Sequence, residues 1–137
     1  MPQHGDLMLV ITGATVGRTC VYSKEFQPGF VSQHVAICRL PPAEVNPHFA
    51  WWGLRGAGGQ AQLLGQRYGQ GKPGLNLGNI RSLSLPFPPL PEQRRIVAEL
   101  DALQAEVDRL KALQVATAAE LDALLPAILD RAFKGEL

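Results

Sequence analysis

The chain has 137 residues, of which 46% are hydrophobic and 18% charged, and its formal net charge is +1. This length allows one modest domain and one additional long helix. The sequence contains no run of eighteen apolar residues, and its first residues lack the basic and apolar regions of a secretory signal. We therefore expect a cytoplasmic protein without a membrane span.

The charge is divided unevenly along the chain. Residues 1–91 carry seven basic and three acidic side chains, a net charge of +4, whereas residues 92–137 carry six basic and nine acidic ones, a net charge of −3. A basic N-terminal part favours a polyanionic partner, and an acidic C-terminal part favours a protein partner.

The cysteines and histidines are scattered. Cys20 and Cys38 are not in CxxC spacing, and His4, His34 and His48 form no ligand pattern with them. This distribution predicts two buried thiols in strands, without a disulfide and without a metal site.

The first predicted element is a pair of strands. The apolar run 7–11 has the length of a strand, and a second strand is expected over 18–22. Gly13 and Gly17 permit a tight turn between them. A phosphate-binding loop is the alternative, but no GxGxxG pattern and no helix start follow these glycines. The pattern favours a hairpin.

The next β-prone stretch covers residues 35–40 and stops at Pro41 and Pro42. Gln33 and His34 lie at its entrance, where side chains often project toward a ligand. A structural role for both, as caps or as hydrogen-bonding groups of the core, is the competing interpretation.

The segment 46–49, Asn-Pro-His-Phe, has two interpretations. Adenine methyltransferases carry a similar tetrapeptide, but here His48 replaces its second proline and no glycine-rich cofactor motif precedes it. A helix start, with Asn46 as the N-cap and Pro47 as the first residue, explains the same residues. We favour the helix start, which directs inward the apolar residues Phe49, Trp51, Trp52 and Leu54.

Two glycine-rich stretches follow. Residues 56–59 loosen the predicted helix, which is expected to resume over 60–66. Residues 65–78 do not form a Walker loop, because Lys72 is followed by proline, and ATP binding is not expected. Their donors and one aromatic ring suit either a nucleic-acid contact loop or an ordinary polar surface loop. These side chains are Arg67, Tyr68, Gln70 and Lys72.

Residues 81–85 alternate between polar and apolar side chains and predict a short strand. The chain then enters a proline-rich run over 86–91. Pro91 and Glu92 suit the first turn of a helix, so the longest helix is expected to begin there.

This helix carries an apolar seam in alternating steps of three and four residues, the rhythm of a coiled coil. The seam consists of Leu100, Leu103, Val107, Leu110, Gln114, Thr117, Leu121, Leu124 and Ile128. Its two polar members, Gln114 and Thr117, suggest a crossing point of two helices. Pro126 is expected to kink or end the helix near Leu125, and a terminal turn or two over 127–133 is expected to close at Lys134-Gly135.

Several of these segments together resemble the specificity subunit of type I restriction-modification systems. They are the residues 5–7 with the turn 12–13, and the segments 32–34, 46–49, 74–77, 85–97 and 124–137. The most specific parts are Glu92-Gln93-Arg94-Arg95-Ile96-Val97 and Ala132-Phe133-Lys134-Gly135-Glu136-Leu137.

The resemblance implies an α+β fold, with a small mixed α/β recognition domain over 1–90 and a coiled-coil helix of the conserved region over 91–137. In this family, two such units usually pack their helices antiparallel, and each recognition domain reads half of a bipartite DNA site. The helices also dock modification subunits, which bring S-adenosylmethionine, while a restriction subunit brings ATP-driven cleavage. The specificity subunit itself is not catalytic and needs no cofactor.

We therefore expect a half or N-terminally shortened specificity subunit that binds double-stranded DNA. Its seam is expected to form an antiparallel homodimer or to pair with another specificity chain. The candidate DNA contacts are the basic and polar residues Arg18, Gln33, His34, Arg55, Arg67, Tyr68, Gln70, Lys72 and Asn76. The alternative function is an assembly or regulatory protein that competes for partner subunits without reading DNA. A methyltransferase acting alone is the third reading.

Overall fold

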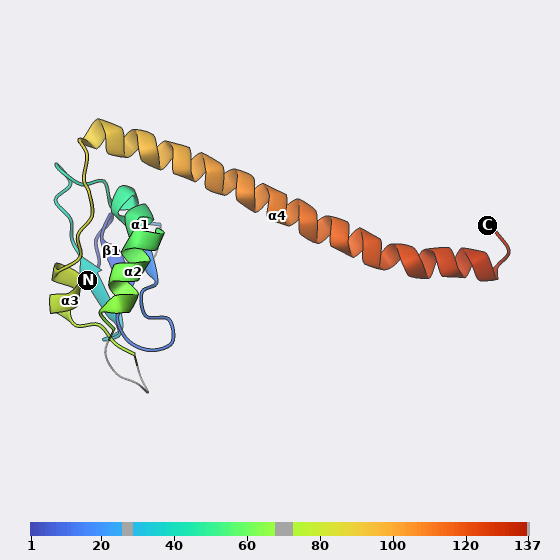
Figure 1. Ribbon diagram of the computed structural model, residues 1–137, viewed down its shortest axis with the longest axis horizontal. Helices are drawn as coiled ribbons and strands as arrows, with labels where there is room; N and C mark the ends of the chain where they lie inside the picture. Colours follow the sequence, from blue (N-terminus) through green and yellow to red (C-terminus); the bar gives the residue numbers. More distant parts are fainter. Residues whose placement is uncertain (26–28, 68–72, 137) are drawn as a thin grey trace. The chain divides into compact units, whose positions relative to one another are not determined.

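A computed structural model describes residues 1–25, 29–67 and 73–136, and it divides the chain into two compact units, Met1–Ala98 and Glu99–Leu137. The elements in chain order are β1 (Leu7–Val10), β2 (Thr19–Val21), β3 (Val35–Cys38), α1 (Pro47–Arg55), α2 (Ala57–Gly65), α3 (Leu77–Arg81) and α4 (Leu90–Phe133). Figure 1 traces them along the chain. A small sheet with helices and one long C-terminal helix confirms the predicted α+β class.

The three strands form one antiparallel sheet in the order β2-β1-β3. Leu7 pairs with Val21 and Leu9 with Thr19, so the predicted hairpin is confirmed, although β2 is shorter than the expected 18–22. Gly13 and Gly17 in the connecting turn have φ angles of 97° and 91°. Only glycine adopts these angles without steric cost, which explains both residues.

The helices α1 and α2 supply apolar side chains to the face of the sheet that carries Leu7 and Leu9. The buried cluster joins Leu7 and Leu9 to Leu54 of α1 and Leu63 of α2. Met8 and Cys20 are cross-strand partners on the alternate positions, and Cys20 is exposed. The prediction of two buried thiols is therefore wrong for Cys20, because strand alternation turns it away from the core, and Cys38 is only half-buried.

Helix α1 begins as the sequence predicts. The Asn46 side chain accepts hydrogen bonds from the backbone N–H groups of His48 (2.9 Å) and Phe49 (3.3 Å), and Pro47 is the first helical residue. Ala50 and Leu54 are its buried residues, whereas Phe49 and both tryptophans are only half-buried. The prediction that the tryptophans belong mainly to the core is thus correct only in part.

Helix α2 starts directly after Gly56, earlier than the predicted residue 60. The reason is close packing of α1 and α2, because a Cβ atom on Gly59 would overlap the Gly53 carbonyl and lie 2.6 Å from the Leu54 Cα. The sequence predicted that these glycines weaken a helix. In the structure they allow two helices to approach each other closely.

The strand predicted over residues 81–85 does not form. The chain instead makes the short helix α3, which ends at Arg81, and an irregular segment that follows it. The Gln62 side chain replaces a partner strand, since it donates to the Ser84 carbonyl and accepts from the Ser84 N–H, both at 2.9 Å. Leu83 and Leu85 still pack against the core, which accounts for the alternating pattern.

The start of α4 is tied to the Met1–Ala98 unit through Gln93. This side chain is completely buried, with 0% exposure. Its amide oxygen accepts from the Asn46 N–H (2.8 Å), and its amide nitrogen donates to the carbonyls of Glu44 (2.9 Å) and Pro88 (2.7 Å). One amide therefore joins the helix to the start of α1 and to the proline run.

Helix α4 continues through Pro126, so the prediction that this residue kinks or ends the helix is wrong with respect to the end. The proline removes one backbone hydrogen bond, but residues 118–125 and 127–133 are rich in alanine and leucine, which favour helix on both sides. The helix closes as predicted at Gly135, which has a φ angle of 69°. Its N–H and that of Glu136 satisfy the Ala132 and Arg131 carbonyls, as in a Schellman motif.

By length and composition alone, α4 is one helix that could cross a membrane. An 18-residue window within it reaches a mean hydropathy of 1.4, and none of that window is buried. A helix with an unpaired apolar seam has the same composition, so this finding does not by itself identify a membrane segment.

The buried carboxylate of Asp6, just before β1, forms an ion pair with Arg39, just after β3. Asp6, which is 3% exposed, accepts two hydrogen bonds from the Arg39 guanidinium, at 2.9 and 2.8 Å, and one from the Gln3 N–H at 2.7 Å. The Arg39 hydrogen bonds lower the pKa of Asp6 below its ordinary value of 3.8, against the opposing effect of burial. The charged pair thus stabilises the fold where the carboxyl is ionised.

We predict that Gln93→Leu lowers the free energy of unfolding by about 2–4 kcal/mol, because three backbone groups lose their hydrogen bonds to a completely buried side chain. Urea unfolding followed by circular dichroism measures the change. Gln104→Leu is the matched control, since the side chain of this glutamine of the same helix donates to the exposed Asp108 side chain. Equal stability of the two variants would contradict the role of Gln93.

We predict that Asp6→Asn lowers the free energy of unfolding by about 1–3 kcal/mol at neutral pH, through loss of charge-assisted hydrogen bonds. Because the folded pKa lies below the unfolded one, the wild-type advantage is complete above pH 3.8 and disappears as the pH falls through the folded value. Unfolding titrations between neutral and acidic pH should show the two curves converging. A difference that is constant with pH would argue against the ion pair as its cause.

Candidate nucleic-acid interface

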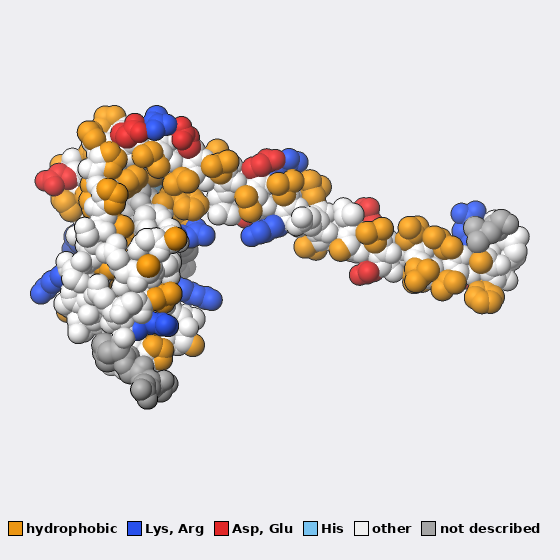
Figure 2. Space-filling view, in the orientation of Figure 1, with side chains coloured by type: hydrophobic (Ala, Val, Ile, Leu, Met, Phe, Trp, Pro, Cys, Tyr) orange, Lys and Arg blue, Asp and Glu red, His pale blue; other side chains and the backbone are white. Residues whose placement is uncertain are grey.

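The exposed cations of the Met1–Ala98 unit come from different elements. Arg18 directly precedes β2, Arg55 ends α1, and Arg67 follows α2, and all three are exposed. Arg67 donates to the Leu64 carbonyl at 3.4 Å. Figure 2 shows lysine and arginine side chains projecting around this unit.

Arg55 is held in place by two aromatic rings. Its guanidinium carbon lies 4.5 Å from the centre of the Trp51 ring and 4.9 Å from that of Trp52. The spacing of three and four residues places these side chains on one face of α1. Stacking restricts the guanidinium while leaving its N–H groups available for a planar acceptor.

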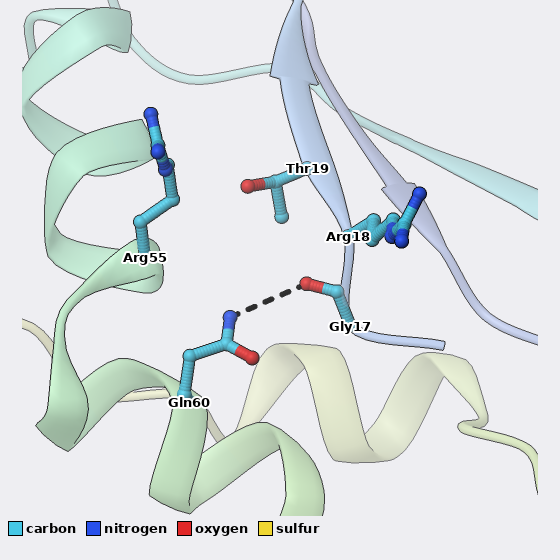
Figure 3. A pocket seen from close by; sticks show the side chains of 5 residues that line it. All are labelled: Gly17, Arg18, Thr19, Arg55 and Gln60. Carbon is cyan, nitrogen blue, oxygen red and sulfur yellow. Dashed lines mark hydrogen bonds between the residues drawn. The ribbon is translucent and has the colours of Figure 1, made fainter. Parts of the chain in front are cut away.

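A pocket of about 300 Å³ lies beside Arg55. Figure 3 shows its lining, which consists of Gly17, Arg18, Thr19, Arg55 and Gln60. The Gln60 amide forms part of the pocket wall, where it donates to the carbonyls of Leu54 (2.8 Å) and Gly17 (3.4 Å). The lining contains two cations and no carboxylate, so it suits a small anion.

Arg18 and Thr19 point in opposite directions. Figure 3 shows the Thr19 hydroxyl directed toward the side of α1, whereas the Arg18 side chain extends away from Arg55. Thr19 Oγ1 is buried and has no hydrogen-bond partner within the part of the chain that the structure describes. The Trp51 indole donates to the Thr19 carbonyl at 3.0 Å, which fixes the backbone next to this hydroxyl.

The structure does not gather the other candidate contacts around this pocket. Gln33 is exposed and His34 half-buried, and the His34 carbonyl accepts from the Ile11 N–H at 2.8 Å. The Asn76 side-chain oxygen caps α3 by accepting from the Asn79 N–H at 2.8 Å. The remaining three candidates, Tyr68, Gln70 and Lys72, lie outside the described residues.

Sequence reasoning missed the contribution of Thr19, Gln60 and the two tryptophans to this site. The spacing of Trp51, Trp52 and Arg55 was a usable signal, since it places an arginine over aromatic rings on one helical face. The pairing of Gln60 with Gly17 had no such signal, because 43 residues separate them in sequence.

The seam of α4 is largely exposed within the single chain. Leu103, Leu110 and Leu121 are 63%, 48% and 62% exposed, and Leu100 is half-buried. Val107, Leu124 and Ile128 are exposed as well, together with the polar pair Gln114 and Thr117. Figure 2 shows hydrophobic side chains along most of the helix. An exposed apolar stripe of this length, interrupted only by Gln114 and Thr117, marks a surface for association.

No metal centre is found in residues 1–25, 29–67 and 73–136, since they contain no group of three or more histidine, cysteine or acidic side chains suited to an ion. Burial, with a smaller effect of Asp6, raises the pKa of the Cys38 thiol. This shift keeps the half-buried thiol protonated at neutral pH and makes it a poor nucleophile.

A family model decides the relationship of the chain to known proteins. Residues 2–117 match the type I restriction modification DNA specificity domain. The chain belongs to this family. The resemblance inferred from these segments of the sequence is thereby confirmed.

Two solved structures are similar to this specificity domain. One, from a study of complex assembly and conformational transition of the type I R-M system, is 31% identical, has a TM-score of 0.79, and is matched over 100% of this chain and 33% of its own. The second, the type I restriction-modification S subunit from M. genitalium, is 20% identical, has a TM-score of 0.63, and is matched over 82% of this chain and 29% of its own. The specificity domain thus spans about a third of these chains. A comparison with curated proteins found no match.

Proposed function

We propose that this specificity domain binds half of a bipartite site on double-stranded DNA, while α4 pairs with a second specificity helix and docks modification subunits. The observation that carries the proposal is the exposed seam of α4 in a member of this family. A helix of 44 residues extends over about 66 Å, at about 1.5 Å per residue. This length suits a spacer between two DNA contacts.

The basic character of the Met1–Ala98 unit supports DNA as its ligand. Arg18 and Arg55 have no ion-pair partner within the described residues, whereas Arg39 and Arg109 are each paired with a carboxylate. Unpaired arginines remain available for phosphates, and such contacts position a protein on a duplex. Arg67 and the polar residues Gln33, His34 and Asn76 are the proposed additional contacts, together with Tyr68, Gln70 and Lys72.

The width of the apolar surface supports more than one partner for α4. Before residue 112 the exposed leucines and valine follow the seam alone. Beyond it, two exposed leucines beside the seam, Leu113 and Leu125, widen the stripe. A narrow seam suits one neighbouring helix, and a broader one suits two, such as a second specificity helix and a helix of a modification subunit.

The same proposal accounts for the hydropathy of α4 without a membrane. Charged residues such as Glu106, Arg109, Glu120 and Asp122 recur along the helix, and seam pairing would bury its apolar stripe against protein. The proposed location is the cytoplasm, where the DNA is.

The proposed module is not an enzyme. The Asn46 side chain, the first residue of the methyltransferase-like tetrapeptide, is used to cap α1. We propose that methyl transfer and cleavage reside in the modification and restriction subunits, which supply S-adenosylmethionine and ATP chemistry, and that this chain contributes only placement on DNA.

We predict that the chain binds a fluorescently labelled random duplex at low salt, and that Arg18→Ala, Arg55→Ala and Arg67→Ala each reduce the slope of log K against log salt by about 0.9. Anisotropy titrations between about 50 and about 200 mM salt measure the slope. Arg109→Ala is the control, because this exposed arginine is paired with Glu106 on α4. Absence of binding even at the lowest salt would favour the assembly or regulatory function instead.

We predict that the chain is a dimer at micromolar concentration and that Leu110→Glu or Leu121→Glu makes it monomeric, because each places a charge in the seam. Sedimentation equilibrium measures the mass. Val115→Glu is the matched control, since Val115 is 71% exposed on the same helix but lies outside the seam. A monomeric wild type, or partitioning of the wild type into neutral lipid vesicles, would contradict seam pairing.

A further inference from the structure

The pocket beside Arg55 has the features of a site for one phosphate group. Gly17 contributes bare backbone to its wall, and an added Cβ there would lie 3.6 Å from Gln60 Oε1. Arg55 supplies a positive charge whose orientation is restricted by Trp51 and Trp52. The pocket therefore combines space, charge and a fixed donor geometry.

The second observation is independent of Arg55. Thr19 lines the same pocket, and its buried hydroxyl oxygen has no partner in the described part of the chain. Buried hydroxyls are normally hydrogen-bonded, so an unpaired one requires an explanation. A ligand oxygen in the pocket provides that explanation, because a hydroxyl can donate to a phosphate.

We propose that this pocket binds a backbone phosphate of DNA, with the Arg55 guanidinium and the Thr19 hydroxyl as donors. The inference rests on the proposed function, since DNA is taken as the source of the phosphate. A concave site suits a phosphate better than a base edge, because side chains that read bases project into a groove. The contact fixes the register of the domain on the duplex and carries no sequence information.

Both tryptophans of the chain lie beneath Arg55, so their emission responds to a ligand that binds the Arg55 guanidinium. We expect duplex DNA to change the tryptophan emission of the wild type. Arg55→Lys keeps the charge but loses the planar, stacked donor pair, and it should weaken binding about tenfold with an unchanged salt slope and abolish the emission change. Preserved affinity and emission change in Arg55→Lys would overturn the inference.

Thr19→Val provides the second variant. It removes only the unpaired hydroxyl, so it should melt no lower than the wild type and bind duplex about threefold to tenfold more weakly. Arg81→Ala is the control for loss of one exposed charge, because Arg81 ends α3 and does not line the pocket. It should keep the full emission change. Unaltered binding by Thr19→Val would overturn the assignment of its hydroxyl as a donor.

Two further comparisons test whether DNA is the source of the phosphate, and whether the pocket assignment or the proposed function is wrong. An emission change that saturates with inorganic phosphate but is absent with duplex would overturn DNA as the source. If the wild type binds duplex and both pocket variants bind equally well, only the pocket assignment fails. If the wild type binds no duplex at low salt, the proposed function fails with it.

Discussion

The buried amide of Gln93 is the interaction on which the rest of the architecture depends. It satisfies one donor and two acceptors of the Met1–Ala98 unit from the first turns of α4. All three partners are backbone groups, so their hydrogen bonds depend on this one side chain. The long helix therefore begins at a defined place in the Met1–Ala98 unit.

Two surfaces of this chain remain incomplete by themselves, and their chemistry differs. The seam of α4 is apolar and regular, so burying it against another apolar helix is favourable. The pocket near Arg55 is cationic, and the Thr19 hydroxyl beside it has no partner among the described residues, so binding of an anion would be favourable there. This separation of apolar and cationic surfaces agrees with the proposed function, in which one part assembles and the other contacts DNA.

Local signals in the sequence predicted local structure well. The Asn46-Pro47 start of α1, the turn with Gly13 and Gly17, and the closure of α4 at Gly135 all follow from backbone preferences of single residues. The failures have different causes. In the 81–85 segment a tertiary contact decides, because Ser84 pairs with the Gln62 side chain instead of a partner strand, whereas Pro126 is tolerated because the residues on both sides favour helix.

The sequence by itself determined the family, the class of the fold and the periodic seam, because these depend on motifs and spacing within short segments. Only the tertiary structure decided that Gln93 is buried, that Asn76 is a cap, and that Thr19, Arg55 and Gln60 share one pocket. These facts depend on residues that are distant in the chain and meet only after folding. Residue spacing cannot predict such contacts, since they arise from how the sheet and the helices pack against one another.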